Sequence, residues 1–416
     1  MANSYFTEIQ ELPPDPLFGL KARYSKDTRT DKVDLGIGAY RDNNGKPWVL
    51  PAVQQAEAKL AKTPGYNHEY LGIAGYEPFV SSAAKIILNG DNKDVLERTV
   101  SVQTLSGTGS LHLAGLFLKK FYKGSNALYL SLPTWANHNQ VFASIGFDVK
   151  SYPYWDNDTK SLDLNGFLNA IALAPPKSVF LLHACAHNPT GLDPTKEEWS
   201  KILEAMSKYD HLPLFDSAYQ GFASGSLEND RFAIEAATSA SSPIKSSPII
   251  ICQSFAKNCG MYGERVGALH IVLPKDLVDL KPAIKSQLNK IIRCEISNPP
   301  AYGAKVVALI LEDKALYKQW TEDLQVMANR IKSMRVKLRD LLTNKYKTPG
   351  NWDHIVDQTG MFSFTGLNKD MVERLERNHG VYLVSSGRAS VAGLNDSNVE
   401  RVAQAIDEVV RFQSKL

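Results

Sequence analysis

Residues 248–267 read PIIICQSFAKNCGMYGERVG, and they carry the strongest indication of the fold. The first seven form a β-prone run, Lys257 follows that run, and Arg265 lies eight positions further on. A charged lysine at the end of a buried strand is unfavourable unless it has a specific task. One such task is a Schiff base, in which a desolvated amine is bonded to an aldehyde.

Arg265 points to a phosphate, because the guanidinium fork matches phosphate oxygens. A cofactor that is both an aldehyde and a phosphate ester is pyridoxal 5′-phosphate. On this segment alone, the alternative is that Lys257 caps a strand and Arg265 lies on a solvated face. The rest of the chain decides between the two interpretations.

Two further strand-like runs precede this one. They are Ser178–Ala186 (SVFLLHACA) and Leu212–Phe215, and the second ends at Asp216. A helix that begins at Thr195, with a capping box completed by Glu198, separates them. This alternation predicts a mostly parallel α/β sheet. Ligands bind at the carboxyl edge of such sheets, where all three runs deliver polar residues.

The C-terminal part of the chain predicts a second, smaller α/β unit. A long helix, residues 313–342, is expected to connect it to the central sheet. The remaining elements are expected to be a strand pair, Met361–Thr365 with Val381–Ser385, and a closing helix from Val399 to Phe412, capped by Ser397 with Glu400.

The composition is that of an ordinary globular protein. At 416 residues, roughly two to three domains are expected. The 47 basic and 44 acidic residues leave a net charge of +3 and form no long block of like charge. No apolar run approaches the roughly 18 residues that span a membrane. We therefore expect neither nucleic acid nor membrane as a partner.

The cysteines give no sign of a metal site or a disulfide framework. Cys185, Cys252, Cys259 and Cys294 form no CxxC pair and no cluster with histidine at zinc-ligand spacing. We expect buried thiols in a reducing compartment and no metal.

The two ends of the chain bear on localisation. The first 18 residues contain two glutamates and an aspartate, unlike a secretory or mitochondrial leader. The last three, Ser414, Lys415 and Leu416, match the address read by the peroxisomal import receptor. We expect a cytoplasmic protein with a peroxisomal pool, and the alternative is an accidental tail on a cytosolic protein.

Nine motifs then occur in order along the chain. They are VDLGIGAYRD (33–42), YNHEYLGIAG (66–75), QTLSGTG (103–109), PTWANH (133–138), HNPTG (187–191), FDSAYQGF (215–222), SFAKN (254–258), SNPPAYGA (297–304) and SSGRASVAGL (385–394). From about Asp34 to Phe412, this series resembles the aspartate aminotransferases, a family of fold-type I pyridoxal-phosphate enzymes.

The resemblance implies a fold-type I α/β architecture. A large domain, residues 48–325, would bind the cofactor on a mostly parallel seven-stranded sheet. Residues 15–47 and 326–416 would form a smaller α/β domain. Residues 1–14 would be an arm on the partner subunit of a homodimer.

The resemblance also assigns the catalytic groups. Lys257 would hold the cofactor and then move the proton at the substrate Cα. Asp216 would keep the pyridine nitrogen protonated, so that the ring accepts electrons. Tyr219 and Asn188 would hydrogen-bond the phenolic oxygen, and Trp135 would stack on the ring. Without this context, Trp135 would be a core residue and Asn188 a turn former.

The phosphate requires a different kind of site. A glycine allows close backbone approach, and a helix N-terminus presents free N–H groups to an anion. The resemblance assigns the phosphate to Ser106, Gly107, Thr108, Ser254 and Arg265, with Tyr70 added from the second subunit.

Substrate recognition would depend on two arginines. Arg388 would grip the α-carboxylate, and Arg293, from the partner subunit, would bind the distal carboxylate of a dicarboxylic amino acid. Gly38 would also contact the substrate, as would Trp135 and Asn188.

The implied activity is aspartate transamination with shared active sites in the homodimer. L-aspartate and 2-oxoglutarate would give oxaloacetate and L-glutamate in a ping-pong cycle. His138 and His183 would stand behind Asp216, or else be satisfied core histidines. The alternatives are an aromatic or broad-specificity aminotransferase and a non-catalytic protein on the same fold. A hydrolase is disfavoured, because the chain has neither GxSxG nor HExxH.

Overall fold

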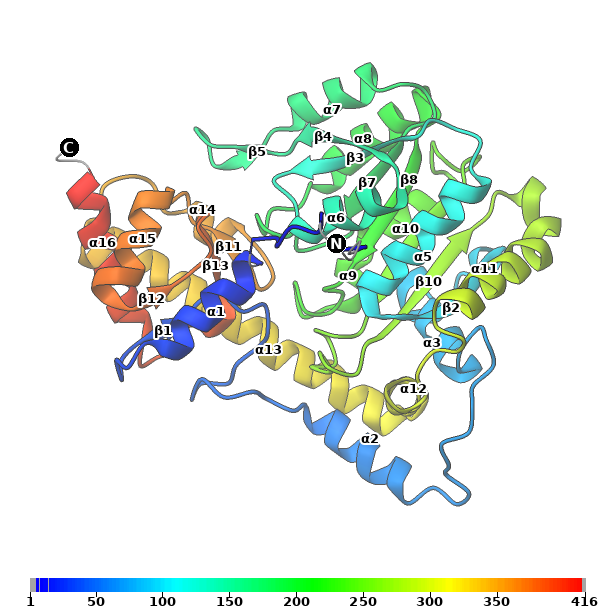
Figure 1. Ribbon diagram of the computed structural model, residues 1–416, viewed down its shortest axis with the longest axis horizontal. Coiled ribbons are helices and arrows are strands. Elements are labelled where there is room, and N and C mark those ends of the chain that lie inside the picture. The colour runs from blue at the N-terminus through cyan, green and yellow to red at the C-terminus, as the bar shows by residue number, and fades with distance from the viewer. Residues whose placement is uncertain (1–4, 7, 14, 414–416) are drawn as a thin grey trace.

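The computed structural model describes residues 5–6, 8–13 and 15–413 of the protein, and Figure 1 shows a larger and a smaller α/β part. One seven-stranded sheet, in the order β2-β10-β9-β8-β7-β3-β4, forms the centre of the larger part. Its strands are β2 (Thr99–Leu105), β3 (Ala127–Leu132), β4 (Asp148–Pro153), β7 (Val179–His183), β8 (Leu212–Ser217), β9 (Ile249–Ser254) and β10 (Val266–Val272). Strand β10 is antiparallel to both neighbours, and the other neighbouring pairs are parallel. The expectation of a mostly parallel seven-stranded sheet is confirmed.

Alternate residues of the central strands face two helical layers. Phe180 and Leu182 of β7 pack on one side, and Val179 and Leu181 pack on the other. The first layer contains α3 (Glu77–Leu88), α7 (Leu164–Leu173), α8 (Lys196–Lys208) and α10 (Phe232–Thr238). The second contains α5 (Ser106–Phe121), α6 (Ala136–Ile145) and α11 (Lys281–Glu295). Burial on both faces explains why these strands are continuous apolar runs.

Shorter elements complete the larger part. They are α2 (Pro51–Ala61), α4 (Lys93–Glu97), the pair β5 (Trp155–Asp156) and β6 (Ser161–Leu162), α9 (Leu227–Asp230), the 3₁₀ turn at Lys275–Leu280 and α12 (Tyr302–Glu312). The predicted capping box at the start of α8 is present. Thr195 Oγ1 accepts from Glu198 N at 3.2 Å, and Glu198 Oε2 accepts from Thr195 N at 2.7 Å.

The smaller part combines an N-terminal segment with the C-terminal quarter of the chain (Figure 1). Its elements are α1 (Pro16–Lys26), β1 (Val33–Asp34), α13 (Lys314–Asp340), a π-helical turn (Leu341–Lys345), α14 (His354–Asp357), β11 (Phe362–Phe364), α15 (Lys369–His379), β12 (Val381–Tyr382), β13 (Arg388–Ser390), a 3₁₀ turn (Val391–Gly393) and α16 (Val399–Gln413). The long helix expected over residues 313–342 is therefore confirmed as α13, with Asp313 as its N-cap.

The predicted pairing of the C-terminal strands is wrong. Strand β12 pairs in parallel with β1, and β11 pairs antiparallel with β13. The chain turns back after β12, where Gly387 N donates to Val384 O at 2.8 Å. This turn delivers Arg388, rather than Val381, to the edge of β11.

The predicted cap of α16 is also wrong. Asn395 Oδ1 accepts from the Ser397 hydroxyl at 2.6 Å and from Asn398 N at 3.0 Å. The Glu400 carboxylate instead pairs with Lys345 of the π-helical turn. The Ser397 hydroxyl is therefore a donor to Asn395 and not the acceptor that the sequence pattern predicted.

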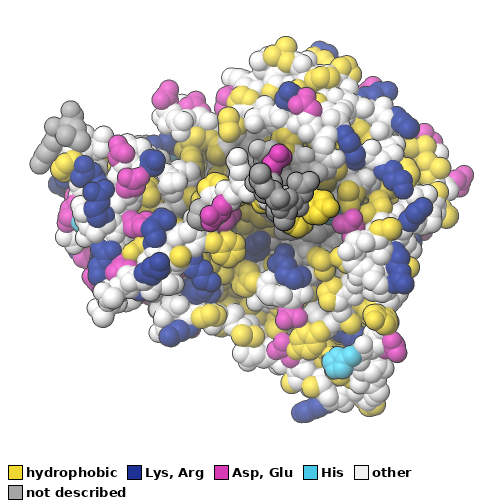
Figure 2. Space-filling model, in the orientation of Figure 1, with side chains coloured by type: hydrophobic (Ala, Val, Ile, Leu, Met, Phe, Trp, Pro, Cys, Tyr) yellow, Lys and Arg dark blue, Asp and Glu magenta, His cyan; other side chains and the backbone are white. Residues whose placement is uncertain are grey.

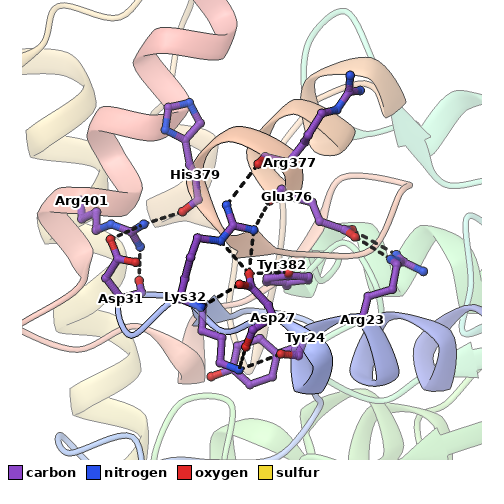
Figure 3. A network of polar contacts seen from close by, with 11 residues as sticks. Arg23, Tyr24, Asp27, Asp31, Lys32, Glu376, Arg377, His379, Tyr382 and Arg401 are labelled. Carbon is purple, nitrogen blue, oxygen red and sulfur yellow. Dashed lines mark hydrogen bonds and ion pairs between the residues drawn. The ribbon is translucent and has the colours of Figure 1, made fainter.

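Polar contacts join the N-terminal segment to the C-terminal helices (Figure 3). Arg23 of α1 pairs with Glu376 of α15 at 2.6 Å, and Arg29 donates to Glu376 O at 3.0 Å. Arg401 of α16 pairs with Asp31 at 2.8 Å. These contacts hold the N-terminal segment against helices α15 and α16. In the described part of the chain, no helix combines the length and apolar character needed to cross a bilayer.

Candidate active site

The carboxyl edge of the central sheet holds the candidate catalytic groups. His183 ends β7 and lies opposite Asp216 of β8, Ser254 ends β9, and Lys257 follows three residues later. A cavity of about 340 Å³ opens at this edge, between the larger and smaller parts. Its lining includes most of the predicted site residues, namely Gly38, Ser106, Gly107, Thr108, Trp135, Asn188, Asp216, Tyr219, Ser254, Lys257, Arg265 and Arg388, together with His183. The surface is hollowed at this junction, with Lys and Arg side chains among hydrophobic ones (Figure 2).

Lys257 is placed as a desolvated amine. Burial lowers the pKa of Lys257, the charge of Asp216 opposes this shift, and Arg265 adds to it. Its Nζ lies 5.3 Å from the centre of the Tyr219 ring. Burial also raises the pKa of Tyr219, so its hydroxyl stays protonated and can donate a hydrogen bond. The arrangement makes the amine easier to deprotonate, beside a phenolic donor.

Asp216 is held in its ionised form. Burial opposes its charge, but the hydrogen bond from His138, reinforced by the electrostatic effect of that ring, outweighs the burial, so the pKa of Asp216 is lowered. His138 Nε2 donates to Asp216 Oδ2 at 3.0 Å, and its Nδ1 lies 2.8 Å from Thr134 Oγ1. Burial lowers the pKa of His183 to about 3, which keeps that ring neutral. His138 thus stands behind Asp216, whereas His183 lies beside Asp216 on the neighbouring strand and lines the cavity.

The start of α5 is suited to an anion. Its first N–H groups have no intrahelical acceptor, and Leu105, at the N-cap position, offers no side-chain oxygen. Ser106 Oγ lies 2.8 Å from Ser254 Oγ, and a Cβ on Gly107 would lie 3.4 Å from Ser254 Cβ. Arg265 adds a positive charge to the same cavity. These features can hold a phosphate.

Arg388 lies at the other side of the cavity as a desolvated guanidinium. Burial lowers its pKa, and its Nη2 donates to Gly36 O at 3.0 Å. The guanidinium lies 4.2 Å from the centre of the Phe362 ring. Among the described residues, its buried Nε has no hydrogen-bond partner. Free donors on a buried arginine are suited to a carboxylate ligand.

Several residues of the lining were not predicted from the sequence. They are Leu17, Ile37, Ala39, Leu111, Cys185, Ala218, Tyr262 and Phe362. Most are apolar and carry no chemical signature. Tyr262 is the exception, because it lies between Lys257 and Arg265, and its hydroxyl accepts from Tyr40 N at 2.8 Å.

Two predicted residues do not line this cavity. Tyr70 is 84% exposed, and Arg293 is exposed near the end of α11. Arg293 Nη1 donates to Ser297 Oγ at 2.5 Å. A second, more open cavity of about 570 Å³ shares Thr108 and Arg265 with the first and is bounded by Ile292 and Ile296. Both residues were predicted to act in the partner's site, which a single chain does not test.

No group of three His, Cys, Asp or Glu side chains that could hold a metal ion occurs within the described residues.

A model of the family "aminotransferase class I and II" matches residues 30–406. The chain belongs to this family. It is 58% identical to the cytoplasmic aspartate aminotransferase of Saccharomyces cerevisiae, over 99% of this chain and 98% of that protein. The crystal structure of the yeast cytoplasmic enzyme superposes with a TM-score of 0.93, at 58% identity, over 98% of this chain and 99% of that one. The broad-specificity aminotransferase of Leishmania mexicana superposes with a TM-score of 0.91 at 41% identity, over 98% of both chains.

The cofactor of this family is pyridoxal phosphate, and the cavity fits it. Asn188 Oδ1 is buried without a hydrogen-bond partner among the described residues, beside the Tyr219 hydroxyl. The amine of Lys257, the carboxylate of Asp216 and the α5 N-terminus supply an aldehyde-binding group, an anion for a ring nitrogen and a phosphate site in one cavity.

Proposed function

We propose that this protein is an aspartate aminotransferase, which exchanges the amino group between L-aspartate and 2-oxoglutarate to give oxaloacetate and L-glutamate. One observation carries the proposal. A desolvated lysine, an ionised aspartate and a buried arginine with free donors face one cavity that the family's cofactor fits.

Each group has a task that its surroundings support. Pyridoxal phosphate, when bound, supplies an electron sink for the pair released at the substrate Cα. Lys257 holds the cofactor through its amine and, once freed, moves the proton at that carbon. Asp216, kept ionised by His138, holds a proton on the ring nitrogen. Tyr219 and Asn188 bind the phenolic oxygen, and Trp135 covers the ring.

Binding is divided between two anchors within the chain. Ser106, Gly107, Thr108, Ser254 and Arg265 bind the phosphate. Arg388 binds the substrate α-carboxylate, next to Gly38. When substrate binds, the small domain (residues 15–47 and 326–416) closes on the large domain (residues 48–325). This closure excludes water from the reacting carbon.

The active form is a homodimer with shared sites. Arg293 of one subunit binds the distal carboxylate of the substrate in the other, and Tyr70 binds the phosphate there. Exposure of both side chains supports this assignment. Four large apolar residues of the N-terminal arm are also exposed, Tyr5, Phe6, Ile9 and Leu12, and this suits an arm that packs on a partner.

Turnover of different amino acids tests the substrate. The protein should transaminate L-aspartate far faster than L-phenylalanine with 2-oxoglutarate as acceptor. Arg293→Asp should lose aspartate activity selectively, because a reversed charge in a desolvated pocket is worth several kcal/mol. Equal losses for aspartate and L-alanine would remove Arg293 from substrate recognition.

An aromatic or broad-specificity aminotransferase is the second candidate. The similarity to the Leishmania mexicana enzyme and the apolar residues Leu17, Ile37 and Phe362 in the cavity favour it. Comparable kcat/KM values for aspartate and phenylalanine would decide for this alternative.

We place the protein in the cytoplasm, as the name of the yeast relative suggests, with a second pool in peroxisomes. The tripeptide Ser414-Lys415-Leu416 lies outside the described residues. Deleting Leu416 should abolish peroxisomal import and leave catalysis intact. An N-terminal fluorescent fusion that gives the same cytosolic pattern with and without Leu416 would contradict the second pool.

A further inference from the structure

Arg335 of α13 is a buried arginine that the proposed function does not use. It is 2% exposed, and burial lowers its pKa to about 9. Its guanidinium donates only to backbone carbonyls in the described part of the chain. Nη1 donates to Ile355 O at 2.9 Å, and Nη2 is shared among Thr359 O at 3.3 Å, Gly360 O at 2.9 Å and Phe362 O at 2.5 Å. Burying a guanidinium is unfavourable, and these donations offset part of that cost, while Arg335 Nε has no hydrogen-bond partner among the described residues.

The segment that Arg335 holds is fixed on its other side by the HNPTG turn. Thr359 N donates to Gly191 O at 2.6 Å, and Thr359 Oγ1 donates to Asp193 Oδ2 at 3.2 Å. A Cβ on Gly191 would lie 2.8 Å from Phe362 O, and a Cβ on Gly360 would lie 2.4 Å from Ala186 Cβ. Residues 359–362 thus lie between Arg335 and this turn, in close contact with both.

The same segment continues directly into the substrate site. Phe362 begins β11, which pairs with the strand that carries Arg388. The Phe362 ring lies 4.2 Å from the Arg388 guanidinium, and its Cζ would lie 2.9 Å from a Cβ on Gly38. A displacement of residues 359–362 would therefore move one wall of the carboxylate site.

We propose that Arg335 is a positioning residue for the α-carboxylate site. By holding four carbonyls of residues 355–362, it sets the place of Phe362 and, through the ring, the orientation of Arg388. It touches neither substrate nor cofactor. This inference rests on the proposed role of Arg388 and extends the substrate site to a residue on the far side of β11.

The test compares holoenzyme variants by KM, kcat and melting temperature. Arg335→Met removes all four donations and should raise KM for both amino acid and 2-oxoglutarate about tenfold, below the roughly hundredfold that a 1 Å misplacement can cost. Its kcat should fall less than its kcat/KM. Arg335→Lys keeps the charge and part of the hydrogen bonding, so its KM should lie between those of the wild type and Arg335→Met.

A matched control and a double variant separate positioning from loss of stability. Arg411 also donates to two carbonyls, Tyr346 O at 2.7 Å and Lys347 O at 2.8 Å, but lies away from the cavity. Arg411→Lys should leave KM unchanged. In an Arg388→Lys background, Arg335→Met should change KM by less than about threefold. The reason is that the free-energy effects of substitutions at two coupled residues are not additive.

Two results would overturn the proposal. One is a wild-type KM in Arg335→Met, or in Arg335→Lys if the first variant does not fold. The other is an equal fold-change in KM on Arg335→Met in the wild-type and the Arg388→Lys backgrounds. Failure of the proposed function is a separate result, namely no turnover of aspartate by the wild type. The comparison is then made with the amino acid that does turn over, since every α-amino acid carries the carboxylate that Arg388 would bind.

Discussion

At the scale of single residues, burial and charge act together on Lys257 and Asp216. Burial disfavours charge on both side chains. Asp216 overcomes it through the hydrogen bond from His138, whereas Lys257 has its pKa lowered. The result is an anion next to an amine that is ready to react.

Replacing the lysine should separate cofactor binding from catalysis. Lys257→Ala should keep the cofactor, because the phosphate and ring contacts remain. It should lose turnover by at least about 10⁴-fold, the upper range for one general acid–base group, since covalent attachment is lost as well. Absorbance of the purified variant and a coupled assay for oxaloacetate give the two readings. Near-normal turnover without added amine would remove Lys257 from the mechanism.

At the scale of elements, Asp230 of α9 holds the turn that follows Tyr219. Its Oδ2 accepts from Gly221 N at 2.8 Å and from Ala223 N at 3.1 Å. Burial raises the pKa of Asp230 from the ordinary value of 3.8 to about 6. Between these values the folded protein keeps a proton that the unfolded chain has released, so stability falls as pH rises through this window.

Asp230→Asn should remove that pH dependence. From pH 4 to 6, the unfolding free energy of the wild type should decrease relative to the variant by on the order of 1.4 kcal/mol for each unit of pKa difference. Denaturant unfolding at several pH values measures this. Asp91→Asn, at an exposed position, is the control and should show no such trend. If the difference in unfolding free energy between the wild type and Asp230→Asn is the same at every pH, Asp230 does not titrate in this window.

How far the sequence predicts an element depends on whether its signal is local. Strand β7 and the capping box of α8 were predictable, because continuous apolar composition and a Thr195–Glu198 spacing are local patterns. The pairing of β11 was not, because two short strands choose partners through the fold of the whole segment. The cap of α16 failed for a related reason, since the Ser397 hydroxyl donates to Asn395 instead of accepting from the helix.

The same limit applies within the site. Lys257, Asp216 and Arg388 were predictable, because charged residues in fixed motifs suggest a task. Phe362 and Leu17 were not, because an apolar side chain in an apolar run gives no sign that it faces a cavity.

At the scale of the whole molecule, two subunits complete each site of the proposed homodimer. Lys257→Ala and Arg293→Asp should each be inactive with aspartate as homodimers. In a hybrid, both lesions fall in one site and the other site is whole, so subunit exchange should recover part of the wild-type activity. Mass spectrometry of the mixture shows whether hybrids have formed. Hybrids without activity would place Arg293 in its own subunit's site or outside recognition.

Lys257, Asp216 and Arg388 are proposed to form a site for transamination of aspartate. The most direct measurement follows the cofactor's absorbance when L-aspartate is added to the holoenzyme without a keto acid. We expect the spectrum of the aldehyde form to convert to that of the amine form, with release of about one oxaloacetate per subunit, as a ping-pong half-reaction requires. An unchanged spectrum would contradict this role of the site, and so would a spectral change without release of oxaloacetate.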